Sequence, residues 1–124
     1  AIIIGLSVSL VCYFMVSVIK QRLGYDDALD AFGVHGVGGA WGAILTGVFA
    51  TSALGGAYGL LAGNAGQMKA QIIGIAATAA YSFFVTFIIF KAIDLIMGVR
   101  AADKDEALGL DLSEHNERAY TLVE

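Results

Sequence analysis

Three stretches of the chain are free of charged residues over a length that suits a membrane crossing. They are residues 1–19, a part of residues 31–68, and residues 70–90. About 20 consecutive apolar residues in a helix span the hydrocarbon core of a bilayer, which is about 30 Å thick. The pattern therefore predicts an all-α membrane protein with three transmembrane helices, over residues of about 1–22, 27–50 and 68–98.

The stretch over residues 31–68 is too long for one crossing, and its composition changes along its length. Its later part, TSALGGAYGLLAGNAG, is rich in Gly, Ala and Asn. Clusters of small and turn-forming residues are typical of loops. We therefore expect a helix that ends near residue 50, followed by a loop of small residues.

The overall composition agrees with a membrane protein that carries a polar tail. Hydrophobic residues make up 58% of the chain and charged residues 15%, against roughly 45–50% and about 25% in soluble domains. Charged residues become frequent after Arg100, which predicts a water-exposed tail over residues 101–124. The net charge of −4 comes largely from this tail and argues against a nucleic-acid partner. The single cysteine, Cys12, excludes a disulfide within the chain.

Basic residues orient the predicted helices. Lys20 and Arg22 follow the first helix, Lys91 and Arg100 lie at the end of the third, and the loop between the second and third carries only Lys69. Because positive charge stays on the cytoplasmic side, we expect a multi-pass protein of the cell membrane, surrounded by lipid, with a cytoplasmic tail. The sequence begins inside an apolar run without an initiator Met, so we expect a fragment of a longer protein.

The predicted second helix carries the candidate chemistry, in the stretch FGVHGVGGAWG. Positions three or four apart share a helix face, and here they form a stripe with little side-chain bulk except one imidazole. The stripe comprises Ala31, His35, Gly38 or Gly39, Gly42 and Thr46. Ionisable residues at membrane depth are costly and usually line a substrate or ion pathway. Two alternatives stay open: the glycines serve helix packing, and the imidazole is a neutral structural group bonded to a carbonyl or hydroxyl.

Catalytic and metal sites are not expected in this helix. His35 has no Cys, Glu or second His at a ligand spacing, so we expect no metal and no cofactor. Asp26 or Asp27 is expected to cap the helix, and Asp27 and Asp30 place carboxylates in its first turn, where the helix dipole favours them. Alternatively, Asp27 biases a cationic path toward His35. The helix offers no serine or cysteine nucleophile for an Asp/His pair, so an enzyme is not expected.

These segments resemble the ammonium transporter family. DDALDAFGVHGVGGAWGAILTGVFA resembles the penultimate conserved helix of that family, GLDLSEHNERAY resembles its cytoplasmic tail, and AIIIGLSVSLV resembles the preceding helix. The resemblance covers essentially the whole chain. It implies the last three helices and the tail of a fold of about eleven helices, the first ten of which form two inverted halves. It also implies a homotrimer with one pore per subunit.

The resemblance implies roles for individual residues. His35 matches the second of two histidines that line a narrow hydrophobic pore, with Ala31 beside it. Ammonium is then recruited, deprotonated and conducted past His35 as ammonia. Asp30 resembles a structural aspartate of the family. If the membrane span covered only residues 31–50, His35 would lie near the cytoplasmic end, whereas the resemblance implies a place near the middle of the pore. The two agree if Asp27 and Asp30 are buried in protein rather than at the lipid surface.

The tail has its own candidate residues. The resemblance places Gly109 and Asp111 in a signature that couples neighbouring subunits and, in prokaryotes, helps to receive a PII-type nitrogen regulatory protein. Ser113 matches a position where plant relatives carry a phosphorylated threonine. From the residues alone, Gly109 suits a positive φ angle or a close backbone approach, and Ser113 suits a helix N-cap. An alternative function is a membrane ammonium sensor or regulatory homologue with little conduction.

Overall fold

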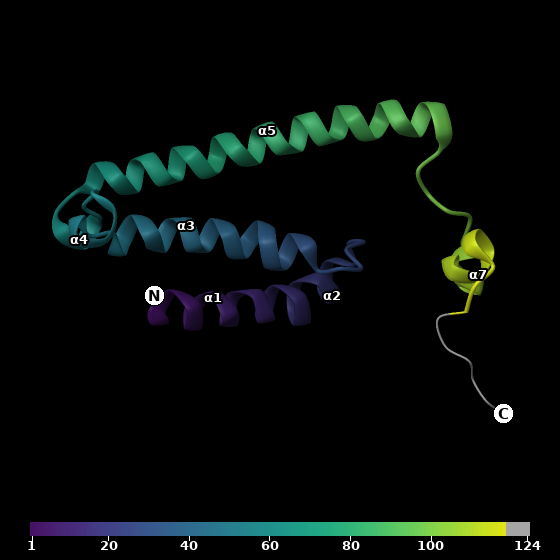
Figure 1. Cartoon of the computed structure of the whole chain (residues 1–124), viewed down its shortest axis with the longest axis horizontal. Coiled ribbons are helices and arrows are strands. Elements are labelled where there is room, and N and C mark those ends of the chain that lie inside the picture. The colour runs from purple at the N-terminus through teal and green to yellow at the C-terminus, as the bar shows by residue number, and fades with distance from the viewer. Residues whose placement is uncertain (119–124) are drawn as a thin grey trace. The chain divides into compact units, whose positions relative to one another are not determined.

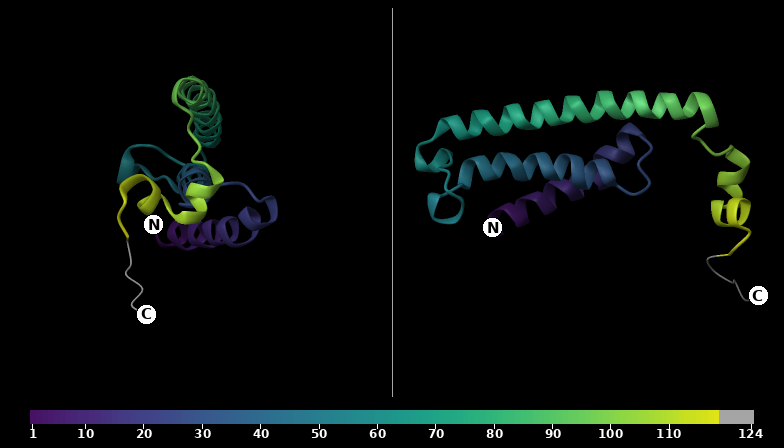
Figure 2. Two further views of the ribbon diagram at one scale, coloured as in Figure 1. Left: turned by 90° about the vertical axis from the view of Figure 1, so that its right-hand side faces the viewer. Right: turned by 45° about the horizontal axis from the view of Figure 1, so that its top comes forward.

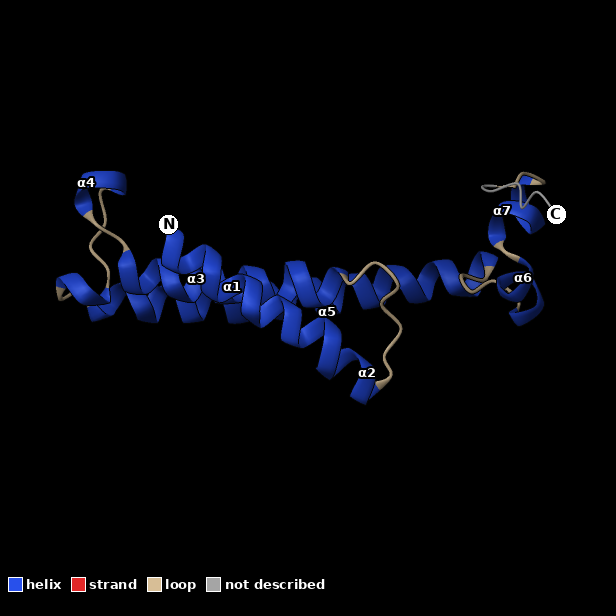
Figure 3. Ribbon diagram, turned by 90° about the horizontal axis from the view of Figure 1, so that it is seen from below, coloured by secondary structure: helices blue, strands red, loops and turns tan. Residues whose placement is uncertain are grey.

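The structure, a computed structural model, describes residues 1–118, and its regular elements there are all helices (Figures 1 and 3). Three helical stretches are long and apolar enough to cross a membrane: Ile2–Leu23, Phe32–Phe49 and Ala65–Met97. No strand occurs within residues 1–118. The predicted fold class, an all-α membrane protein, is confirmed. The chain forms two units, which divide between Tyr81 and Ser82.

The first spanning helix is continuous and consists of α1 (Ile2–Phe14), η1 (Met15–Ile19) and α2 (Lys20–Leu23). The η1 stretch is a π-helical turn, in which the N–H of Lys20 donates to the carbonyl of Met15. The helix ends at Gly24, which has a φ of 63°, and glycine is the usual residue in this left-handed conformation after a helix. Lys20 and Arg22 lie in the last turn, where cations complement the helix dipole.

The second spanning helix consists of a π-helical stretch, η2 (Phe32–Val37), followed by α3 (Gly38–Phe49). Helical structure begins at Ala31, later than the expected start near residue 27. The reason is Asp30, whose φ of 55° lies outside the right-handed helical region. Asp30 is therefore not in the first turn, which corrects the expectation.

Asp27 lies in the turn before this second helix, and its side chain caps the first turn of the helix. Its Oδ1 accepts a hydrogen bond from the N–H of Ala31 at 2.8 Å, and its Oδ2 accepts one from the N–H of Phe32 at 3.0 Å. The first N–H groups of a helix have no partner within the helix itself. Both carboxylate oxygens of Asp27 satisfy such groups, so Asp27 caps the helix, although from four residues before Ala31 rather than from the expected N-cap position.

The first two spanning helices lie side by side (Figures 1 and 2). Within residues 1–118 no apolar side chain is fully buried. The contact is made by a close backbone approach at Gly33 and Gly38 and by a hydrogen bond from Trp41 Nε1 to Ser7 Oγ at 3.2 Å. Lipid is as apolar as a leucine side chain, so small residues and polar contacts are what hold membrane helices together.

The loop after α3 contains α4 (Ser52–Gly55) and a 3-10 turn, η3 (Leu60–Ala62). It folds back over the end of α3, where the N–H of Gly59 donates to the carbonyl of Ala50 at 2.8 Å. A Cβ on Gly59 would lie 2.7 Å from the carbonyl oxygen of Val48 and 2.8 Å from the nitrogen of Ala50. The predicted small-residue loop is therefore packed tightly against the backbone at this point.

The third spanning helix, α5 (Ala65–Met97), has 33 residues. At 1.5 Å per residue it is about 50 Å long, more than the hydrocarbon thickness. Near its start, Gln71 packs against Gly47 of α3. It ends at Gly98, which has a φ of 72°, and the N–H of Val99 donates to Asp94 Oδ1 at 3.3 Å.

The described part of the tail contains two short helices, α6 (Asp103–Leu108) and α7 (Leu110–His115) (yellow in Figure 2). Gly109 joins them with a φ of 100°, which confirms the expected positive φ. Ser113 lies inside α7, and its Oγ donates to the carbonyl of Gly109 at 3.2 Å. The expected N-cap role of Ser113 is therefore wrong. Ala119 and Tyr120, the last two residues of the tail motif, lie outside the described residues.

Candidate functional site

His35 lies within the π-helical stretch η2, and its side chain is exposed in this chain. Within residues 1–118 its imidazole makes no hydrogen bond to a carbonyl or a hydroxyl. The alternative of a structural imidazole bonded to a neighbouring group of this chain therefore has no support in the described part. The imidazole is available to groups from outside the chain.

The open face of the second spanning helix continues from His35 along α3. A Cβ added to Gly39 or Gly42 would meet no atom within 4 Å. Thr46 is exposed on the same face, and its Oγ1 donates to the carbonyl of Gly42 at 2.9 Å. Ala31 is exposed at the start of the helix. We call this face, made of Ala31, His35, Gly39, Gly42 and Thr46, the open stripe.

Gly38 does not belong to the open stripe. It is buried against the first helix, where an added Cβ would lie 2.7 Å from Cys12 Sγ and 3.4 Å from Val8 Cγ2. Of the two alternatives in the sequence, Gly39 therefore lies with His35, and Gly38 serves packing. Gly38 and Gly42 share no neighbour, so the spacing Gly38-x-x-x-Gly42 does not mark a single packing face.

Charged groups tie the two spanning helices together just before the open stripe. Lys20 Nζ donates to Asp30 Oδ1 at 2.5 Å and to the carbonyl of Asp27 at 2.6 Å. Both side chains of the ion pair are half-buried, with exposed fractions of 26% for Lys20 and 34% for Asp30. The sequence analysis used Lys20 only to orient the first helix in the membrane and missed its ion pair with Asp30. The pattern that could have indicated the pair is a cation and an acidic cluster on either side of one short turn.

An aromatic pair lies in the same turn. The rings of Tyr25 and Phe32 meet edge to face, with centroids 5.9 Å apart. The hydroxyl of Tyr25 is buried and has no hydrogen-bond partner within residues 1–118. Aromatic pairs of this geometry stabilise by about 0.5–1.5 kcal/mol beyond their buried area. The turn that carries Asp27 and Asp30 is thus held by both charge and ring contacts.

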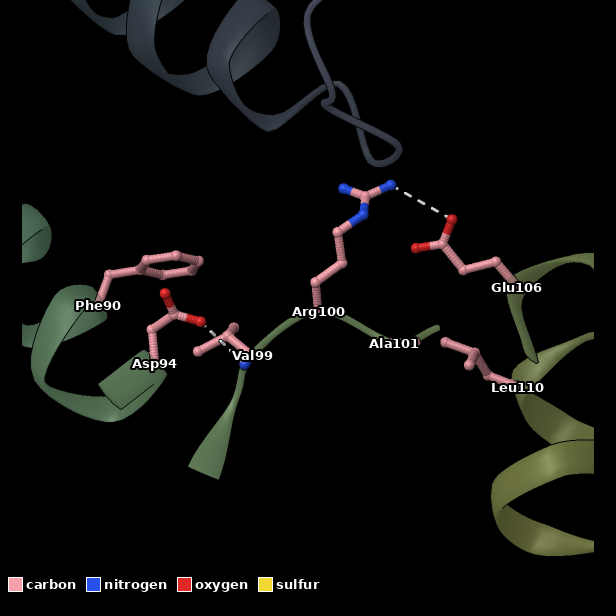
Figure 4. Close-up of a pocket in the computed structure, with 7 residues that line it drawn as sticks. All are labelled: Phe90, Asp94, Val99, Arg100, Ala101, Glu106 and Leu110. Carbon is pink, nitrogen blue, oxygen red and sulfur yellow. Dashed lines mark hydrogen bonds and ion pairs between the residues drawn. The ribbon is translucent and has the colours of Figure 1, made fainter. Parts of the chain in front are cut away.

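A separate cavity of about 580 Å³ lies in the second unit (Figure 4). Its lining is Phe90, Asp94, Val99, Arg100, Ala101, Glu106 and Leu110. Arg100 and Glu106 form an ion pair across it at 3.3 Å, and both side chains are substantially exposed. Solvated pairs of this kind contribute little. Of the residues that the sequence analysis singled out, Arg100 lines this cavity, and none of the candidate pore or tail residues does.

Comparison with known proteins identifies the family. The Ammonium Transporter Family matches residues 1–120. The chain is 50% identical over 122 residues to an ammonium transporter of Bacillus subtilis, covering 97% of this chain and 30% of the relative.

Two further relatives agree with this match. An ammonium transporter of Aquifex aeolicus is 48% identical (98% of this chain, 29% of the relative), and Ammonium transporter Amt1 of Archaeoglobus fulgidus is 44% identical (98% and 31%). The chain thus spans less than a third of the length of these curated relatives. The family match extends over nearly all of its own residues, and its described part is a set of apolar spanning helices, so the chain belongs to the ammonium transporter family of membrane proteins.

Proposed function

We propose that the chain is the C-terminal part of a longer transporter that moves ammonium or ammonia across the cell membrane. The names of the relatives, all ammonium transporters, support ammonium as the substrate. The observation that carries the proposal is the open stripe, a contact-free face of a spanning helix that bears one imidazole among glycines. In this proposal the stripe forms one wall of a narrow apolar pore, and helices of the longer protein form the other walls.

The chemistry of the stripe suits ammonium in particular. An ammonium ion that meets an apolar constriction must lose its water at great cost or give up its proton. Imidazole is the side chain whose ordinary charge change falls near neutral pH, so it can accept or relay that proton. In the proposal, His35 pairs with a second histidine from the rest of the longer protein. Gly39 and Gly42 keep the wall thin enough for a small molecule to pass close to the backbone.

The test is a His35→Ala variant of the full-length protein, reconstituted in lipid vesicles. We expect ammonium flux to fall by about tenfold, or discrimination against potassium to be lost, because general acid–base groups contribute factors of at least this size. Gly5→Ala in α1, where an added Cβ would meet nothing within 4 Å, is the control and should transport normally. Wild-type flux, current and selectivity in His35→Ala would contradict the proposal. Ammonium binding without flux in the wild type would favour the sensor alternative instead.

For the tail, we propose that the protein is a homotrimer in which the cytoplasmic tail couples the pores and receives a PII-type regulatory protein. The basic residues at the helix ends support the cytoplasmic placement. Gly109 supports a defined tail conformation, because its φ of 100° is one that other residues rarely adopt. Asp111 and Ser113 follow directly in α7, where a phosphate on Ser113 would add negative charge beside Asp111.

Gly109→Asp should lower transport in its own subunit and in wild-type neighbours. The substitution strains the backbone at a positive φ, and its Cβ would lie 2.6 Å from Asp111 Oδ1. The measurement is ammonium flux in cells that express wild type and variant at controlled ratios, with mixed trimers confirmed by differential tags. We expect flux to fall faster than the variant fraction rises. A proportional fall would contradict coupling through the tail.

A further inference from the structure

The loop between α3 and α5, residues 50–64, has an apolar surface. Its exposed large side chains include Tyr58, Leu60 and Leu61, with exposed fractions of 54%, 43% and 72%. The loop lies inside the charge-free stretch from Ala31 to Met68, whereas the tail after Arg100 carries many charges. Loops that lie in water are normally polar, so the surface of this loop suits less aqueous surroundings.

Hydrogen bonds within the loop occupy several of its polar groups. The N–H of Gly59 donates to the carbonyl of Ala50 at 2.8 Å, and the N–H of Asn64 donates to the carbonyl of Gly59 at 3.1 Å. The side-chain amide of Asn64 also donates to the carbonyl of Tyr58 at 3.0 Å. Backbone groups without a partner are costly close to hydrocarbon. These bonds therefore lower the cost of placing the loop against lipid.

The loop is held at the level where the second spanning helix ends and the third begins. It folds back onto α3, because Gly59 lies against the backbone of Gly47, Val48 and Ala50. A chain folded in this way stays close to the membrane surface instead of extending into water. Lys69, the first charged residue after the loop, is exposed in the second turn of α5, and lysines near the ends of spanning helices reach the membrane–water interface. The apolar side chains of the loop thus lie next to the headgroup region.

We propose that the loop is an interfacial anchor, whose side chains Tyr58, Leu60 and Leu61 insert into the headgroup region of the lipid bilayer. The side of the membrane is the one opposite Lys20 and Arg22, since the loop follows the far end of the second helix. Tyrosine suits this place, because its ring lies in apolar surroundings while its hydroxyl reaches water. The anchor fixes the end of α3 at the bilayer surface and does not depend on the proposed transport.

The experiment locates a fluorescent label on the loop of the full-length protein, embedded in nanodiscs of phosphatidylcholine and phosphatidylglycerol. Leu61→Cys carries an environment-sensitive bimane label, in a background without other cysteines that includes Cys12→Ala. Nitroxide lipids probe the headgroup region and the ends of the acyl chains, and iodide probes water. Lys104→Cys, at an exposed position of α6, is the control for a label in water.

We expect the headgroup nitroxide to quench the label at Leu61 more strongly than the chain-end nitroxide does. Iodide should quench this label at least about threefold less than the label at Lys104, because interfacial segments lie about 5–10 Å inside the boundary of headgroups and acyl chains.

A charge variant tests whether the apolar side chain causes the insertion. With the label moved to Tyr58→Cys, Leu61→Asp should raise iodide quenching by about twofold or more, since a carboxylate is costly in the apolar layer. Leu61→Met keeps an apolar side chain and is the matched control, which should leave the quenching unchanged. Tyr58→Cys also reports the depth of the loop if Leu61→Cys does not assemble.

Three results would overturn the anchor. Iodide quenching of the loop labels as strong as that at Lys104 would place the loop in water. Labels that neither nitroxide nor iodide reaches would show that another segment of the longer protein covers the loop. Equal quenching in Leu61→Asp and Leu61→Met would show that the apolar side chain does not hold the loop in lipid. None of these measurements uses transport, so failure of the anchor is distinguishable from failure of the proposed function.

Discussion

Replacing Gly59 by alanine is expected to leave little folded protein in the membrane. Gly59 has a φ of −91°, which any residue adopts, so the effect does not come from the backbone conformation. A Cβ there would lie 2.7–2.8 Å from three backbone atoms, those of Val48, Ala50 and Gly47. Backbone atoms at the end of a helix cannot move aside as a flexible side chain does. We expect a loss of more than about 3 kcal/mol of stability, at the upper end of overpacking effects.

Gly56→Ala is the matched control in the same loop. Gly56 has a φ of 74°, but a Cβ there would meet nothing within 4 Å. Only conformational strain is introduced, which amounts to about 1–2 kcal/mol. The measurement is the yield of assembled protein in mild detergent together with resistance to unfolding by SDS. Equal stability of the two variants would contradict the close packing of the loop on α3.

The second large effect is expected from Asp27→Ala, which removes the cap of the helix that carries His35. The N–H groups of Ala31 and Phe32 would both lose their partner. Loss of a capping side chain costs about 0.5–2 kcal/mol, and we expect a value near the upper end because two hydrogen bonds are lost. We also expect weaker transport, because a frayed first turn no longer fixes the imidazole.

Asp27→Asn separates the two hydrogen bonds. The amide keeps one acceptor oxygen and replaces the other by a donor, so about half of the loss is expected. Asp103→Ala removes an exposed acidic residue from the first turn of α6 and should cost at most about 1 kcal/mol. SDS-induced unfolding of each variant measures these differences. If Asp27→Ala unfolds like Asp103→Ala, the capping role does not stabilise the protein.

Much of the fold could be predicted from local features. The charge-free runs indicated three spanning helices, and the described structure has three helices of that kind. Asp27 was recognisable as a cap because carboxylates before an apolar helix satisfy its first N–H groups. Gly109 was recognisable because only glycine takes a φ of 100° readily. These predictions needed only the residues themselves and their immediate neighbours in sequence.

The candidate site could be predicted only in part. His35 was identified because an ionisable side chain in an apolar stretch is costly and therefore uncommon. The choice between Gly38 and Gly39 could not be made, because it depends on where the neighbouring helix lies. The ion pair of Lys20 with Asp30 was missed for a related reason: the left-handed φ of Asp30, which makes the helix begin later than expected, is set by the turn as a whole.

The sequence by itself determined that this protein crosses the membrane, roughly where it does so, and which side chain lies at greatest cost in the apolar layer. Those properties follow from the length of the apolar runs and from the free-energy cost of burying an ionisable group. Both depend on the residues themselves and not on how the helices pack. Only the tertiary structure decided which face of the second helix is open. Gly33 and Gly38 lie against Val16 and Cys12 of the first helix, whereas an added Cβ at Gly39 or Gly42 would meet nothing within 4 Å. Glycines on opposite sides of a helix have the same composition and hydrophobicity, so only the place of the neighbouring helix distinguishes the packed face from the open one.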